Sequence, residues 1–209
     1  SSFDLLKISD GSVRHVALPS GIKAEAPDWS AAGKRFAFSV IGNDAVEMWV
    51  GDVATAKVRK IEGLKLNPFF GRSFQWMPDQ KTLLVQSLPK GQGKPPAPPA
   101  VPPGPNVKET AGGSASSTYE LRDVLTSDHD EASFDYYGTV QVAMVDVAAG
   151  TVTPIGKPGL YIGMSPSPDG HLLVETIKRP YSRVTTYRRF PRAVEVWDRT
   201  GKLVKHIAS

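Results

Sequence analysis

Cysteine is absent from the 209 residues of this chain. Its absence excludes disulfide bonds, cysteine-ligated metal sites and a cysteine nucleophile. Long apolar runs are missing too, since no stretch approaches the roughly 18 consecutive apolar residues of a membrane helix. Histidine is scarce, and its four copies lie far apart in the sequence: His15, His129, His171 and His206. We therefore expect no metal, no cofactor and no membrane partner.

The chain also lacks a strong excess of positive or negative charge. The chain carries 25 Lys and Arg against 21 Asp and Glu, a net charge of only +4. Such a small excess does not indicate a nucleic-acid partner. With 40% hydrophobic residues the chain is long enough to bury a sizeable core. The lack of cysteine leaves the compartment open, whether bacterial cytoplasm, periplasm or secretion.

A tight turn followed by a short apolar run occurs three times in the sequence. The copies span residues 29–38, 76–85 and 166–174. The third follows the second at about twice the spacing of the first pair. Pro, Asp or Gly in the turn and apolar residues after it indicate a chain reversal that leads into a buried strand.

A second pattern alternates with the first and is centred on aspartate. Apolar residues precede an Asp-containing turn and more apolar residues follow it, at Asp10, Asp52, Asp146 and Asp198. This pattern is typical of hairpins. Together the two patterns predict units of four antiparallel strands every 40 to 50 residues, which is the blade period of a β-propeller. A β-sandwich built from hairpins is the alternative.

The predicted blades do not complete a ring. Residues 1–18 supply half a blade, and residues 28–63, 74–156 and 162–207 supply one blade each, with an insert at 88–138. The fold class is therefore all-β, a partial propeller of about three and a half blades. Because propellers close with 4 to 8 blades, we expect the chain to be a piece of a longer protein.

The insert contains two unusual segments. Residues 95–105 hold seven prolines, which forces extended geometry and predicts a stiff spacer or a disordered loop. Ser117 and Glu120 fit a capping box and predict one short helix that continues through Val124 and Leu125. The acidic residues 128–131 that follow are expected to form an exposed turn.

The connection within the last predicted blade has the opposite charge. Residues 176–194 contain no acid and six bases: Lys178, Arg179, Arg183, Arg188, Arg189 and Arg192. Three interpretations compete: a rim paired with the acidic insert, a surface for an acidic substrate, and a nucleic-acid surface. Since strands alternate in direction, the insert and this segment should emerge on one face and be able to pair.

Several motifs make the chain resemble the N-terminal propeller of the prolyl oligopeptidase (S9) family of serine peptidases, and within it the glutamyl endopeptidase branch. The resemblance covers roughly residues 64–202. It rests on Phe74-Gln75-Trp76, residues 82–85, 95–105 and 125–130, Phe134-Asp135-Tyr136-Tyr137, Arg179-Pro180-Tyr181-Ser182, Arg189-Phe190-Pro191 and Val194-Glu195-Val196-Trp197.

The resemblance implies a role without catalysis for this chain. Family members carry a Ser-Asp-His triad on an α/β-hydrolase domain, with the serine in a Gly-x-Ser-x-Gly elbow that this sequence lacks. The implied parent is a serine peptidase whose propeller gates peptide access and shapes the substrate cavity of the hydrolase domain. Candidate substrate contacts are Arg179, Tyr181, Arg183, Arg188 and Arg189. A stand-alone propeller that binds a protein partner is the alternative function.

Overall fold

The computed structural model describes residues 2–98 and 124–209, and in this part strands dominate. All strand pairs are antiparallel, as expected for an all-β chain. The first hairpin pairs β1 (Phe3–Leu6) with β2 (Val13–Val16). The second group comprises β3 (Lys23–Ala24), β4 (Asp28–Trp29), β5 (Arg35–Ile41), β6 (Val46–Asp52) and β7 (Lys57–Leu66).

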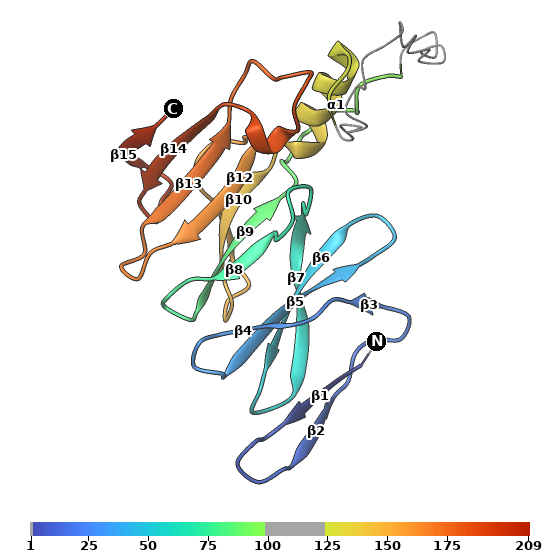
Figure 1. Cartoon of the computed structure of the whole chain (residues 1–209). Helices are drawn as coiled ribbons and strands as arrows, with labels where there is room; N and C mark the ends of the chain where they lie inside the picture. Colours follow the sequence, from blue (N-terminus) through green and yellow to red (C-terminus); the bar gives the residue numbers. More distant parts are fainter. Residues whose placement is uncertain (1, 99–123) are drawn as a thin grey trace, which may run out of the picture.

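Two further groups follow along the chain. The third comprises β8 (Phe74–Trp76), β9 (Thr82–Ser87), β10 (Gln141–Asp146) and β11 (Val152–Pro154). The fourth comprises β12 (Tyr161–Pro166), β13 (Leu172–Ile177), β14 (Arg192–Trp197) and β15 (Leu203–Ala208). Figure 1 shows the four groups fanning out one after another in sequence order.

The second and third groups join into one nine-stranded sheet, but the junction is small. Strands β7 and β9 share a single register pair, Leu66 with Ser87. Within each group the neighbouring strands pair in sequence order, except that β3 and β4 both pair with β5. This order is compatible with the four-stranded units that the repeats predict, and the exact division into blades stays a prediction.

The aspartate of each repeated hairpin turn has a direct structural role. Its side chain accepts hydrogen bonds from backbone N–H groups of the same turn, at 2.9 Å from Thr55 to Asp52 and 2.8 Å from Ala148 to Asp146. Asp10 and Asp198 do the same in their turns. These hydrogen bonds stabilise the turn through residues that are close in sequence. The turn pattern can therefore be recognised from the sequence alone.

Apolar cores lie between successive groups rather than inside any one of them. Phe36 and Phe38 of β5 pack with Val16 of β2, and Ile61 of β7 packs in a cluster with Val85 of β9. A third cluster joins the last two groups through Met77, Leu84, Val142, Leu172, Val174 and Trp197. A single group therefore cannot bury its apolar faces alone, as the propeller interpretation requires.

Within the described residues the α-helix follows the segment in which the sequence predicts one. Helix α1 spans Asp128–Gly138, so the acidic residues expected to form an exposed turn are its first turn. Val124 and Leu125, expected to be helical, are not. The predicted capping box at Ser117 and Glu120 lies outside the described residues, as does most of the proline-rich segment. No helix of the described part is long and apolar enough to cross a membrane.

Candidate functional site

Helix α1 begins with a capping box that the sequence analysis overlooked. The hydroxyl of Ser127 accepts a hydrogen bond from the backbone N–H of Asp130. The Asp130 carboxylate in turn accepts one from the backbone N–H of Ser127. Hydrogen bonds from the hydroxyl and backbone N–H of Thr126 lower the pKa of Asp130. Three acids in the first turn also match the positive end of the helix dipole. These local features stabilise the start of the helix.

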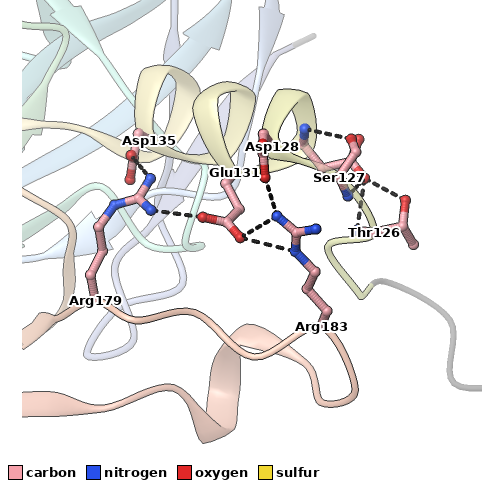
Figure 2. A network of polar contacts seen from close by, with 8 residues as sticks. Thr126, Ser127, Asp128, Glu131, Asp135, Arg179 and Arg183 are labelled. Atoms are coloured by element: carbon pink, nitrogen blue, oxygen red, sulfur yellow. Dashed lines mark hydrogen bonds and ion pairs between the residues drawn. The ribbon is translucent and has the colours of Figure 1, made fainter.

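Arg179 connects this helix to the β13–β14 connection. Its guanidinium donates to Glu131 at 2.7 Å and to Asp135 at 2.6 Å, two acids one turn apart on α1. Both carboxylates raise the pKa of Arg179, Asp135 more than Glu131. The guanidinium also lies 4.4 Å from the centroid of the Tyr181 ring, a cation–π contact. One arginine thus holds α1 at two points, as Figure 2 shows.

Arg183 holds the same helix nearer to its N-terminus. Its Nε donates to Glu131 at 3.2 Å and its Nη2 donates to Asp128. Glu131 receives both guanidinium groups and its side chain is only 15% exposed, whereas that of Asp128 is 97% exposed. The Glu131 contacts are therefore less screened by solvent than the Asp128 contact. We call these five residues the Arg–acid network: Asp128, Glu131, Asp135, Arg179 and Arg183 (Figure 2).

An aromatic cluster lies beneath the Arg–acid network. Phe134 of α1 is 7% exposed and makes edge-on contacts with Tyr181 and Phe190. The Tyr181 hydroxyl donates to Asp135, and burial together with this bond raises the pKa of Tyr181. Gly138 ends the helix so close to Leu160 that an added Cβ would lie 2.9 Å from its side chain. Apolar packing and charge therefore both attach α1 to the β13–β14 connection.

Arg188 and Arg189 lie on the short 3-10 helix η1 (Tyr187–Arg189) and are exposed. Within the described residues neither forms a salt bridge with an acid. The Arg188 guanidinium lies 5.5 Å from the centroid of the Tyr187 ring, and the backbone carbonyl of Arg188 accepts a hydrogen bond from Arg192 at 2.5 Å. Arg192 in turn pairs with Glu175 at 3.1 Å.

The structure thus separates the five predicted substrate contacts into two sets. Arg179, Tyr181 and Arg183 contact α1, and this confirms the expected pairing of the acidic insert with the basic segment. Arg188 and Arg189 do not take part in that pairing. Asp135 is an ion-pair partner that the charge pattern of the sequence did not indicate, although it lies in the Asp-Tyr-Tyr motif one helical turn after Glu131.

Two hollows lie elsewhere on the described surface. A cavity of about 250 Å³ lies between β8 and β12, and Arg72, Gln75 and Gln86 are among its lining residues. A wider one of about 770 Å³ is lined by parts of β7, β10 and β11. Among the described residues no group of three or more His, Asp or Glu side chains is placed to hold a metal ion.

Curated proteins of similar sequence are plant peptidases. The chain is 36% identical over 199 residues to a probable chloroplastic glutamyl endopeptidase of Arabidopsis thaliana, covering 91% of this chain and 20% of that protein. It is 33% identical to the corresponding protein of Oryza sativa, covering 90% of this chain and 21% of that one. The chain therefore spans about a fifth of the length of these relatives. No family model matches it.

Solved structures of similar fold include a peptidase and the β-propeller domain of a protease. The acylaminoacyl peptidase of Pyrococcus horikoshii matches with a TM-score of 0.60 and 17% identity, covering all of this chain and 28% of that one. The β-propeller domain of the Trilobed protease of Pyrococcus furiosus matches with a TM-score of 0.59 and 16% identity, covering all of this chain and 48% of that domain. These likenesses confirm the propeller fold.

Proposed function

Because this chain is a propeller portion of the prolyl oligopeptidase (S9) kind, related in sequence to the glutamyl endopeptidases, we propose that it controls access to the active site of a serine peptidase. The catalytic triad in this proposal belongs to an α/β-hydrolase domain outside the chain. The propeller forms one wall of the substrate cavity and admits short or unfolded peptides.

The attachment of α1 to the β13–β14 connection is the observation that carries this proposal. An insert of about fifty residues between β9 and β10 would be loosely held if only its two ends fixed it. Instead, α1 is bound to the next group of strands by Arg179 and Arg183, with Phe134 packed below. A wall that excludes folded proteins has to be rigid in this way.

The test uses the full parent peptidase. Replacing Glu131→Gln and Asp135→Asn together removes both carboxylates that Arg179 contacts while keeping the side-chain shapes. We expect the variant to cleave a site within a folded protein at least tenfold faster relative to the same sequence in a short peptide. Asp44→Asn with Glu62→Gln removes two exposed acids elsewhere and is the matched control.

Two results would overturn the proposal. One is an unchanged ratio of protein to peptide cleavage when hydrogen exchange shows that α1 has loosened. The other is a parent protein that neither hydrolyses peptides nor reacts with a fluorophosphonate probe for active serines. The second result would favour the stand-alone binding module.

A further inference from the structure

The bases of the β13–β14 connection differ in whether an acid already pairs with them. Arg179, Arg183 and Arg192 each contact a carboxylate of this chain. Lys178, Arg188 and Arg189 are exposed and pair with no acid among the described residues. The excess positive charge of the connection is therefore concentrated on the second set, and most of all on the two adjacent arginines.

The backbone that carries these two arginines is held in place. Phe190, directly after them, is 3% exposed and stacks on Tyr181 at 5.1 Å between ring centroids. Tyr187, directly before them, packs against Phe70 at 5.5 Å. Arg192 donates to the carbonyl of Arg188. Two exposed guanidinium groups are thus presented on a short segment that is anchored on both sides.

This arrangement suits recognition of a carboxylate. A guanidinium offers paired N–H donors that match the two oxygens of a carboxylate, and a fixed backbone lowers the entropy lost on binding. Stacking on Tyr187 limits the freedom of the Arg188 side chain further. Arg179 and Arg183 are less suited to the same role because their guanidinium groups already pair with the carboxylates of α1.

We propose that Arg188 and Arg189 bind an acidic side chain of the peptide substrate, while Arg179 and Arg183 position α1 and do not contact the substrate. The inference rests on the proposed function, since it needs a peptide-cleaving parent. It goes further by assigning selectivity for acidic peptides to two of the five candidate residues.

The experiment compares two peptides that differ only in Glu against Gln at the cleaved residue, with the full parent peptidase. The variant Arg188→Met, Arg189→Met keeps apolar side chains and removes both charges. We expect kcat/KM for the Glu peptide to fall at least tenfold while that for the Gln peptide changes less than twofold. Lys34→Met with Lys57→Met, two exposed bases of the second group of strands, is the matched control and should change neither value.

The two sets of arginines give different patterns. Arg179→Met or Arg183→Met should change the Glu and Gln peptides in parallel and speed hydrogen exchange in α1. The single variants Arg188→Met and Arg189→Met replace the double variant if its thermal unfolding temperature falls. A Glu-to-Gln ratio unaffected by every change at positions 188 and 189 overturns the proposal, even if the gating test succeeds.

Nucleic-acid binding gives another contrary outcome. The same two arginines could bind a single-stranded oligonucleotide with an affinity that falls steeply with salt. If they do, and the Glu-to-Gln ratio is unchanged by their replacement, the surface binds phosphates and not peptide carboxylates.

Discussion

Arginine side chains join neighbouring groups of strands outside the charged connection as well. Arg14 of β2 donates to the carbonyls of Val53 and Ala54, and Arg59 of β7 donates to those of Val147 and Ala148. Arg14 and Arg59 occupy equivalent positions, each after the first valine of the outer strand of a hairpin. In both cases the acceptors belong to the hairpin turn of the next group. The same residue thus makes the same contact in two repeats.

Replacing Arg59 tests how much this contact stabilises the chain. Arg59→Met keeps most of the side-chain volume but removes the donors to two backbone carbonyls. Because hydrogen bonds from charged donors contribute more than neutral ones, we expect the free energy of unfolding to fall by about 2 kcal/mol. Urea unfolding followed by tryptophan fluorescence measures the change. Lys57→Met, an exposed base on the same strand, should cost far less, and equal losses in the two variants would contradict the assignment.

Asp79 makes a link of a different kind between the last two groups. Partial burial works to raise its pKa, but the backbone N–H of Lys81 and the guanidinium of Arg199 outweigh this and lower the pKa to about 2. Its ordinary value is 3.8. A carboxylate with a depressed folded-state pKa stabilises the fold above the unfolded-state pKa, and that stability is lost as the pH falls toward 2.

Asp79→Asn should therefore remove one pH-dependent part of the stability. Above pH 4 the variant should be less stable than the original chain, and the difference should shrink as the pH falls from about 4 to 2. Urea unfolding at a series of pH values measures both chains. Asp44→Asn, which replaces an exposed acid in another turn, is the matched control and should cost far less stability at pH 6. If the difference in unfolding free energy between the two chains stays constant from pH 6 to pH 2, the loss of stability comes from the changed side-chain shape and not from the lost charge.

Helix α1 shows how an element can depend on residues far away in the sequence. Only Phe134 and Gly138 are buried, so the helix has no broad apolar face of its own. Its attachments come from Arg179, Tyr181 and Arg183 on the next group, and from residues 67–70 after β7, which donate to its last turn and pack against Phe134. A short helix with so little apolar surface is marginal by itself, and tertiary contacts supply most of its stability.

Phe134→Ala is the direct test of this dependence. Removing a buried phenylalanine ring from a packed cluster costs about 3 to 5 kcal/mol, and here the loss should fall mainly on α1 and the connection that it contacts. Hydrogen exchange should show faster exchange of α1 amides than of β9 and β10 amides. Tyr137→Ala, which truncates a half-exposed ring on the same helix, is the control. Equal loss of protection in α1 and both strands would contradict a locally attached helix.

The sequence predicts the hairpins better than it predicts this helix, for a physical reason. Strand alternation and turn aspartates such as Asp52 act within a few residues, so their pattern is visible in the sequence. The acids from Asp128 onward carry no helical apolar period, and their partners lie about fifty residues away. The contact between insert and basic segment was predictable from opposite charge and strand direction. Which arginines remain without an acid was not, because it depends on side-chain placement.

At the scale of the whole molecule, the groups of strands stand next to each other along an arc and share cores only with their neighbours (Figure 1). Side chains of β8 add links between groups. Trp76 of β8 donates its indole N–H to the carbonyl of Asp28 at 3.1 Å, and Gln75 donates to that of Met164 at 2.6 Å. One strand therefore contacts the groups on both sides, which should couple their unfolding.

Removing one of these links should loosen one boundary and not the whole chain. Gln75→Leu deletes the donor to Met164 at the boundary between the third and fourth groups, at a cost of about 1 kcal/mol. Amides of β12 to β15 should then exchange faster, while those of β5 to β7 keep their protection, because the core between the second and third groups is untouched. Gln141→Leu is the control. The side-chain amide of Gln141 donates to the carbonyls of Val142 and Ile155, which belong to its own group of strands. A uniform loss of protection across all groups would mean that the chain unfolds as one unit and that its groups are not separable elements of a propeller.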